Sequence, residues 1–96
     1  MTQRLDRIRQ ALEARFQPAL LEITDDSARH AGHAGASPGG ETHYSVHMVS
    51  AGFTGMTRVA RSRAVHEALA GEFATGLHAL ALRLQSPEEA LKGHDL

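Results

Sequence analysis

The sequence has 96 residues, seven histidines and no cysteine, and its formal net charge at pH 7 is −1. This length suits one small domain. Because cysteine is missing, the chain can form no disulfide and can offer no thiolate ligand. The net charge excludes the strongly basic composition of many nucleic-acid-binding proteins. No apolar run approaches the roughly 18 residues that span a membrane, and no signal peptide is expected. We therefore expect a single cytoplasmic domain over residues 1–96 with no membrane partner.

The first half of the chain predicts a helix followed by a strand hairpin. Apolar residues recur every three or four positions over 4–16 and predict an amphipathic helix, which ends before Pro18. Polar and apolar residues alternate over 19–25 and 42–50, and this period of two predicts two half-buried strands. Residues 26–41 are glycine-rich and predict a long loop between them. The expected inward positions are Leu5, Ile8, Leu12, Phe16, Leu21, Ile23, Tyr44, Val46 and Met48.

The second half predicts a helix, a third strand and a short final helix. Thr57 is placed to cap a helix that runs to about residue 74, and Gly76 ends it. Alternation over 77–85 predicts a strand. Ser86 to Glu89 predict a capping box for a helix that frays over 91–96. The expected inward positions are Val65, Ala68, Leu69 and Phe73 in the helix, and His78, Leu80, Leu82 and Leu84 in the strand.

The predicted order is α-β-β-α-β-α, which indicates a two-layer α+β domain with its helices on one face of a three-stranded sheet. The third strand follows a helical crossover, so it can lie parallel to one of the first two. We therefore expect a mixed sheet.

The histidines are the candidate chemical groups. His30 and His33 lie in the long loop, His78 begins the third strand, and His43 and His47 lie on the polar face of the second. Imidazole is a good ligand for iron, zinc and copper, but two histidines are too few for a closed zinc site. They suit a site whose other ligands come from a partner. The alternatives are a core histidine at 78 and solvated histidines in the loop. His66 and His94 are expected at the surface.

Arg58, Arg61 and Arg63 form a second candidate site. They follow the segment GFTG, residues 52–55, and a G-x-x-G turn before basic residues resembles the backbone-clamping loop of KH domains. Here the turn follows a strand, whereas a KH clamp joins two helices. The alternative is a solvated arginine face. One basic patch on a nearly neutral domain predicts salt-sensitive binding to phosphates.

An enzyme is not expected. Ser45, with His43 and His47 on the same strand face, is the only candidate for a nucleophile beside a base, and no acid or oxyanion turn is placed to complete a triad.

The sequence contains several short blocks that follow one another along the chain: Asp26–His33, Gly40–Tyr44, Phe53-x-Gly55, Val59–Val65, Gly76–Leu80 and Ser86–Glu89. Together they resemble the BolA-like proteins. The resemblance extends from about residue 4 to residue 90, and the combination of blocks is specific although each alone is not.

The resemblance implies a fold similar to class II KH domains and a role beside CGFS monothiol glutaredoxins. Such pairs hold a bridging two-iron two-sulfur cluster and serve iron–sulfur trafficking or iron regulation. The family's ligands are a histidine at the start of the last strand, which His78 matches, and a His or Cys in the long loop, which His30 matches best and His33 next. His43 is expected to border the site. The isolated chain, a monomer or weak homodimer, is expected to hold no cluster alone, because the thiolates must come from the partner and glutathione.

One position departs from the family pattern. BolA-like proteins usually carry Arg-His-Arg in the second helix, and this chain has Arg61, Ser62 and Arg63. Ser62 removes a histidine from a surface often proposed to contact nucleic acid. The departure weakens the alternative function, a DNA-binding transcriptional regulator that uses Arg58, Arg61 and Arg63, and leaves the cluster hypothesis unaffected.

Overall fold

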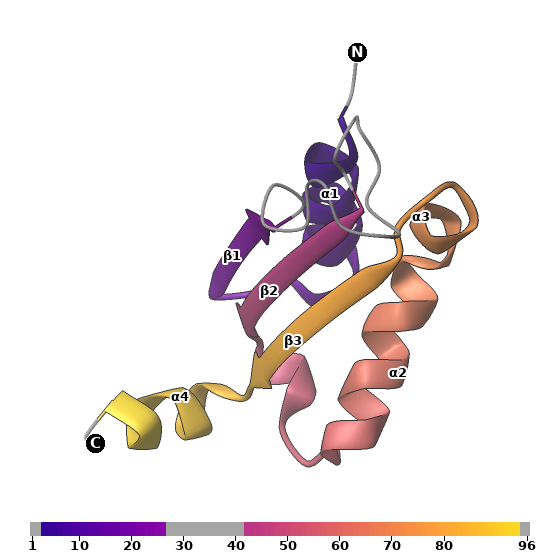
Figure 1. Ribbon diagram of the computed structural model, residues 1–96. Coiled ribbons are helices and arrows are strands. Elements are labelled where there is room, and N and C mark those ends of the chain that lie inside the picture. Colours follow the sequence, from indigo (N-terminus) through magenta and orange to yellow (C-terminus); the bar gives the residue numbers. More distant parts are fainter. Residues whose placement is uncertain (1–2, 27–41, 95–96) are drawn as a thin grey trace.

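A computed structural model gives the fold of the protein for residues 3–26 and 42–94 (Figure 1). The elements follow the predicted order, except that two helices replace the one expected to run to about residue 74. The loop expected over 26–41 lies, apart from Asp26, outside the described residues. In chain order the elements are α1 (Arg4–Phe16), β1 (Leu20–Asp25), β2 (His43–Val49), a 3₁₀ turn (Ala51–Phe53), α2 (Arg58–Ala68), α3 (Ala70–Ala74), β3 (Ala79–Gln85) and α4 (Pro87–His94).

The three strands form one sheet in the order β1-β2-β3. β1 and β2 are antiparallel, with Leu21 opposite Met48, so the predicted hairpin is confirmed. β2 and β3 are parallel, with His43 opposite Ala79, so the predicted mixed sheet is confirmed too. The parallel pairing places the first residues of β2 and β3 at the same end of the sheet.

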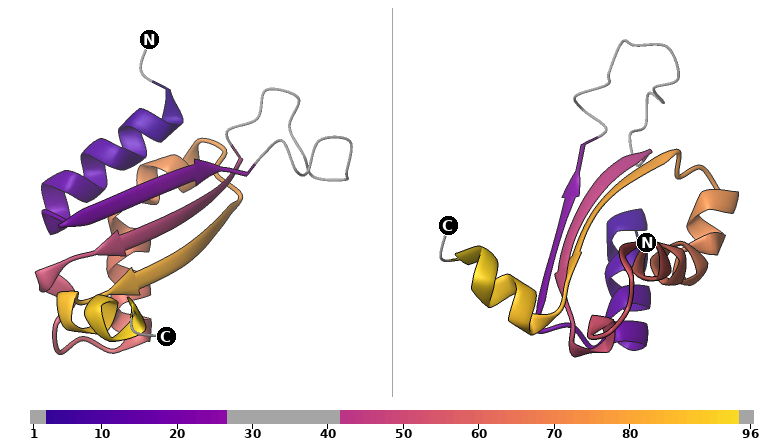
Figure 2. Two further views of the ribbon diagram at one scale, coloured as in Figure 1. Left: turned by 90° about the vertical axis from the view of Figure 1, so that its left-hand side faces the viewer. Right: turned by 90° about the horizontal axis from the view of Figure 1, so that it is seen from below.

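The helices are divided between the two sides of the sheet. α1, α2 and α3 lie on one side, whereas α4 leaves the end of β3 and projects from the other (Figure 2). The expectation that all helices share one face is therefore wrong for α4. Polar strand residues such as Glu22 and His47 face this second side, which the first three helices leave open. Across residues 3–26 and 42–94, no helix has both the length and the apolar character needed to cross a membrane.

The core lies between the sheet and the helices α1 and α2. Alternation in β2 turns Tyr44, Val46 and Met48 inward, as predicted. The Ser50 hydroxyl donates to the Phe16 carbonyl at 2.7 Å and thereby ties the end of β2 to the end of α1. The buried residues of this core are Ile8, Leu12, Tyr44, Val46, Met48, Phe53, Val65, Leu69 and Leu77.

The predicted capping box begins α4. The backbone N–H of Ser86 donates to Glu89 Oε1 at 2.8 Å, and the backbone N–H of Glu89 donates to Ser86 Oγ at 3.3 Å. Pro87 occupies the first helical position, where its missing N–H costs nothing. The helix continues to His94, into the segment that was expected to fray.

Candidate functional site

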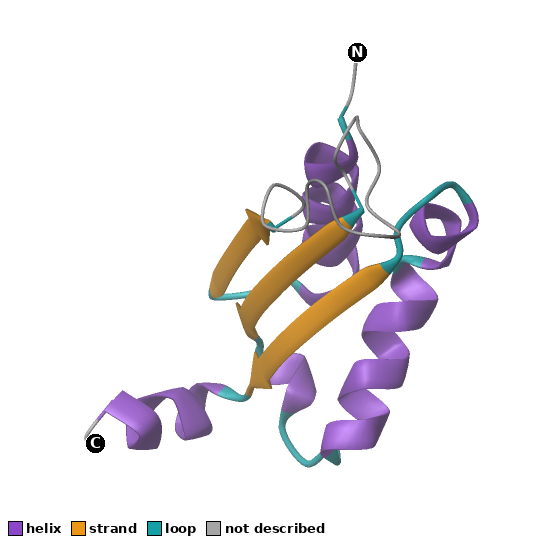
Figure 3. Ribbon diagram, viewed as in Figure 1, coloured by secondary structure: helices purple, strands orange, loops and turns teal. Residues whose placement is uncertain are grey.

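His78 lies on the short loop that joins α3 to β3 (Figure 3). Gly76 in this loop has a φ of +126°, which suits glycine, and a Cβ there would lie 3.2 Å from Arg4 Nη2. Leu77 is buried, and the backbone N–H of His78 donates to the Thr42 carbonyl at 2.8 Å. The His78 side chain itself is exposed. Its backbone is thus fixed while its imidazole remains available at the surface.

The alternative of a core histidine at position 78 is wrong. Alternation over 77–85 predicted His78 on the apolar face of the strand, but β3 begins at Ala79. The left-handed turn at Gly76 directs Leu77, at 4% exposure, into the core in place of His78. The leucines of β3 keep the predicted pattern, because they lie within the regular strand.

The imidazoles of His43 and His78 lie side by side. Because β2 and β3 start at the same end of the sheet, the two rings stack with centroids 6.3 Å apart and planes 22° apart. His43 is half-buried, and its Nδ1 shares a hydrogen bond of 2.9 Å with the hydroxyl of the buried Thr42. His43 therefore borders the His78 side chain.

The two residues that flank 27–41 are held at this same end of the sheet. The backbone N–H of Asp26 donates to the His43 carbonyl at 2.8 Å, and the Thr42 carbonyl accepts from His78. Both ends of the segment are therefore attached to the histidine pair, one through the His43 carbonyl and the other through the His78 N–H. The two candidate ligands within the segment lie outside the described residues; they are His30 and His33.

Two other histidines have contacts of their own. His47 Nδ1 lies 3.1 Å from Glu22 Oε1 and its Nε2 lies 2.8 Å from Gln85 Oε1, so it joins all three strands. His66 stacks on Phe73 with ring centroids 5.2 Å apart. The side chain of His94 lies outside the described part of the chain. Within residues 3–26 and 42–94, no group of three or more His, Asp or Glu side chains could hold a metal ion.

Ser45 contacts a carboxylate, and its neighbouring histidines have other partners. Its hydroxyl donates to Asp26 Oδ2, whereas His43 bonds to Thr42 and His47 to Glu22. This arrangement differs from a serine whose proton is taken by a histidine base.

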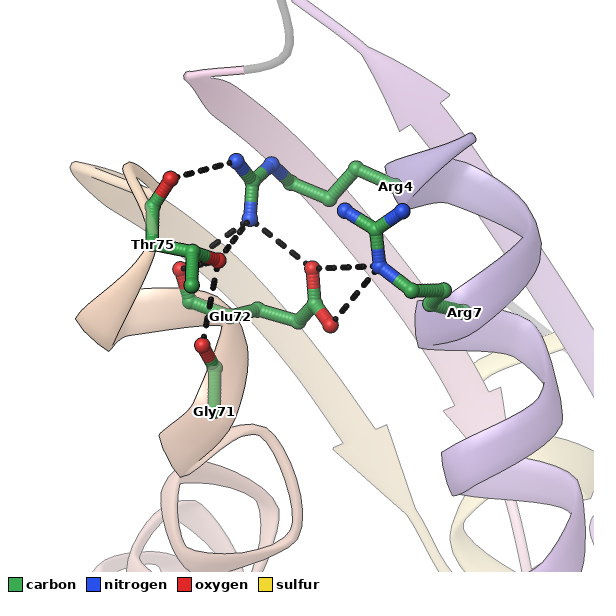
Figure 4. Close-up of polar contacts among 5 residues, drawn as sticks. All are labelled: Arg4, Arg7, Gly71, Glu72 and Thr75. Atoms are coloured by element: carbon green, nitrogen blue, oxygen red, sulfur yellow. Dashed lines mark hydrogen bonds and ion pairs between the residues drawn. The ribbon is translucent and has the colours of Figure 1, made fainter. Parts of the chain in front are cut away.

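A buried arginine holds the helix that leads to His78 (Figure 4). Arg4 Nη1 donates to the side chain and the carbonyl of Glu72, at 2.8 Å and 3.0 Å. Nη1 also donates to Thr75 Oγ1 at 3.1 Å, and Nη2 donates to the Thr75 carbonyl at 3.0 Å. Arg7 Nε donates to the same carboxylate from its exposed side. The cluster joins α1 to α3 immediately before the Gly76 turn. The sequence analysis missed it.

The three arginines predicted as one face are separated in the structure. Arg58 and Arg63 are exposed, but Arg61 is buried at 5% exposure. Arg61 Nε donates to the Met56 carbonyl and Nη1 donates to the Leu84 carbonyl, both at 3.1 Å. The guanidinium also pairs with Glu89. Arg61 thus joins α2, β3 and α4, and its predicted place on an exposed arginine face is wrong, because these acceptors draw it inward.

The Glu89 carboxylate makes the attachment of α4 sensitive to acid. The hydrogen bond from Arg61, followed by that from the Ser86 backbone, lowers the pKa of Glu89 from 4.5 to about 2. A carboxyl with a lowered pKa stabilises the fold above its unfolded-state pKa, and this contribution is lost as the pH falls from about 4.5 toward 2. We expect Glu89→Gln to lower the urea midpoint at pH 6 and to lower it less at pH 3. Equal differences at both pH values would contradict the assignment.

The fold and the histidine pair define a class of protein: a small α+β domain with an exposed histidine before the last strand. The family model described as "BolA-like protein" matches residues 12–89. The chain therefore belongs to the BolA-like family. The solved structure of BolA1 from Arabidopsis thaliana has a TM-score of 0.83 and 43% identity, and the match covers 93% of this chain and 97% of that one. The predicted family and fold class are confirmed.

Two curated relatives are also similar. "Protein BOLA1, chloroplastic" of Arabidopsis thaliana is 44% identical over 89 residues, which are 91% of this chain and 56% of that protein. "DNA-binding transcriptional regulator BolA" of Escherichia coli is 42% identical over 84 residues, which are 88% of this chain and 76% of that protein. The chain thus spans little more than half of the Arabidopsis protein. Because that relative is named chloroplastic, the cytoplasmic location stays a prediction.

Proposed function

We propose that the chain is a non-enzymatic adaptor that binds a CGFS monothiol glutaredoxin and shares a bridging two-iron two-sulfur cluster with it, in iron–sulfur trafficking or iron regulation. The observation that supports this most is the exposed imidazole of His78. Its backbone is held in place, because the N–H groups of His78 and Ala79 both donate to the Thr42 carbonyl. In this proposal His78 is one ligand. The second is His30, with His33 as the alternative, from the segment whose two ends are attached beside His78.

The donor set fits a shared cluster. The chain has no cysteine, so it offers only imidazoles, and the thiolates must come from the glutaredoxin and from glutathione. Histidine and cysteine together ligate two-iron two-sulfur clusters of the Rieske type. His43 limits the space open to the His78 ring on one side. When bound, the cluster supplies the iron and sulfide.

Co-purification with a CGFS glutaredoxin tests the ligand assignment. We expect a coloured heterodimer whose visible absorption and circular dichroism change in His78→Ala, because the cluster loses one ligand. His66→Ala is the matched control, since His66 is exposed on α2 and contacts Phe73. Separate His30→Ala and His33→Ala variants identify the second ligand. An unchanged spectrum and thermal stability in the His78→Ala/His30→Ala double variant would overturn the assignment.

A second candidate function is DNA binding by a transcriptional regulator. Two observations favour it: the Escherichia coli relative carries that name, and Arg58 and Arg63 are exposed on α2. With Arg61 buried, only these two members of the predicted face are exposed to phosphates.

The salt dependence of DNA binding tests this candidate. We expect the Arg58→Ala/Arg63→Ala double variant to bind promoter DNA more weakly and to lower the slope of log K against log salt by about 2, near one per phosphate contact. Arg9→Ala/Arg15→Ala, with the same net charge, is the control on α1. An unaltered slope in the α2 variant, or no complex at low salt, would exclude DNA binding through this face.

A further inference from the structure

A groove separate from the histidine pair lies between α2 and β3. Its volume is about 530 Å³, within the range of roughly 300–1,000 Å³ common for ligand pockets. Residues of the last half of β3 line it, whereas His78 precedes the first residue of that strand. The two sites therefore lie toward opposite ends of β3. The lining residues are Arg58, Arg61 and Ser62 from α2, Leu82 to Gln85 from β3, and Glu89 from α4.

One wall of the groove is the edge of a sheet. β3 is the last strand in the order β1-β2-β3, and no further strand within residues 3–26 and 42–94 pairs with it. The N–H of Ala79 donates to the Thr42 carbonyl, and the Gln85 carbonyl accepts from Ser50, so these residues direct their main-chain groups toward β2. Because direction alternates along a strand, Leu80, Leu82 and Leu84 direct theirs to the open edge.

The contact of Arg61 with Leu84 agrees with this direction. Its guanidinium reaches the Leu84 carbonyl at 3.1 Å from the side of α2, away from β2. Arg61 therefore occupies the outward carbonyl at the far end of β3 and closes the edge there. The main-chain N–H and C=O groups of Leu80 and Leu82 point to the open edge and come before the Leu84 carbonyl that Arg61 occupies. An added strand would therefore pair with β3 only over this short stretch.

The groove presents positive charge around an apolar floor. Arg58 on α2 and Arg83 on β3 are exposed, and Leu82 and Leu84 are half-buried. Arg83 is in register with His47 and Glu22, so it lies on the open face of the sheet, whereas Arg58 lies on the side covered by α2. Glu89, the acidic residue of the lining, pairs with Arg61. The remaining charge is that of two exposed guanidinium groups, which complement carboxylates on a ligand.

We propose that this groove binds an extended acidic peptide segment of a partner protein by adding it as a strand to β3. Main-chain hydrogen bonds to Leu82 and Leu80 would hold the peptide, as in other complexes formed by strand addition. Because successive side chains of a strand point to opposite faces, one carboxylate would pair with Arg83 on the open face and a neighbouring carboxylate with Arg58 on the α2 face. This inference does not depend on the cluster proposal, because none of its residues belongs to the histidine site.

The test uses a fluorescent peptide of about six residues, a common strand length, with two adjacent glutamates flanked by valines, so that it presents a carboxylate on each face. We expect saturable fluorescence anisotropy and the largest amide NMR shifts at Leu80 and Leu82. Arg58→Glu and Arg83→Glu should each weaken binding by up to about fivefold, which is the upper limit for an exposed ion pair. Arg63→Glu is the matched control, because it changes the same charge on α2 outside the groove, and it should change affinity by less than about twofold.

Two further probes separate strand addition from simple charge attraction. A peptide N-methylated at alternate backbone amides cannot form the ladder, so it should bind at least about tenfold more weakly. Oligothymidine tests whether the groove prefers nucleic acid. The proposal is overturned by no peptide binding at about 1 mM, by an equal loss in Arg63→Glu, by unimpaired binding of the methylated peptide, or by oligothymidine that displaces the peptide and binds more tightly.

Discussion

Replacing Arg4 with alanine should lower the free energy of unfolding by about 3 kcal/mol, because it removes a buried, charged hydrogen-bond donor. The Arg4 guanidinium donates to the side chains and carbonyls of both Glu72 and Thr75. These acceptors would lose a charged donor, and α3 would keep only the exposed Arg7 pair of this cluster as a link to α1. A loss of this size is a large part of a typical stability of 5–15 kcal/mol. Urea unfolding, with the slope of the transition checked for constancy, measures it.

Arg7 provides the matched control for Arg4. It contacts the same Glu72 carboxylate from the same helix, but its side chain is 40% exposed against 9% for Arg4. We expect Arg7→Ala to cost less than about 1 kcal/mol, the usual range for an exposed ion pair. Similar losses in both variants would show that the burial of Arg4 adds no stability.

Replacing Arg61 with alanine should also cost about 3 kcal/mol, and α4 should lose its attachment to the domain. The substitution removes the donors to the Met56 and Leu84 carbonyls and the partner of Glu89. It also leaves a space beside Phe53, whose ring centroid lies 5.8 Å from the guanidinium carbon. The loss of the donor to two part-buried carbonyls, and the loss of a charged pair, each carry a cost of the order of 1–3 kcal/mol.

Arg63 is the control for Arg61, because it is two residues away on the same helix and is exposed. We expect Arg63→Ala to change stability by less than about 0.5 kcal/mol, as is usual for surface substitutions. Amide hydrogen exchange of α4 should increase in Arg61→Ala and remain unchanged in Arg63→Ala. If Arg61→Ala left both the urea midpoint and this exchange unchanged, its contacts would not be stabilising. Any loss of DNA binding in Arg61→Ala must be corrected for unfolding.

The burial of Arg4 and Arg61 could not be predicted from the sequence, for the same reason in both cases. Arg4 lies four residues before Ile8, and Arg61 lies four residues before Val65, so each occupies the inward stripe of its helix. The helical spacing alone places them inward. Arginines are nevertheless expected on the polar face of a helix, because long cations are seldom buried without partners. The partners, Glu72 and Glu89, come from distant parts of the chain, and only the tertiary structure shows them.

The helices and strands themselves were largely predictable. α1, the hairpin and the capping box of α4 depend on local patterns, and their predictions are confirmed. The break between α2 and α3 at Leu69 was missed. Leu69 is buried, with a φ of −106°, and the change of direction there carries Glu72 toward α1. A contact between distant segments decided this, so the helical pattern could not show it.

The candidate site was predictable by residue type but not by geometry. His43 was expected to border the site of His78, but the stacking of the two rings follows from the parallel register of β2 and β3, which alternation could not specify. The exposure of His78 depends on a single left-handed residue, Gly76. His30 and His33 stay predictions, to be separated by their two alanine variants.

The parallel pairing of β2 and β3 also has a kinetic consequence. All of α2 and α3 lies between His43 and His78 in the chain, so the two rings meet only after a long crossover has closed. Such distant contacts carry a high loop-closure cost and form slowly compared with local ones. The histidine pair is therefore a product of long-range closure, and it should disappear together with the β2–β3 ladder when the domain unfolds. A chain that has formed only the β1–β2 hairpin would present His43 without His78, and so could not offer the paired imidazoles to a partner.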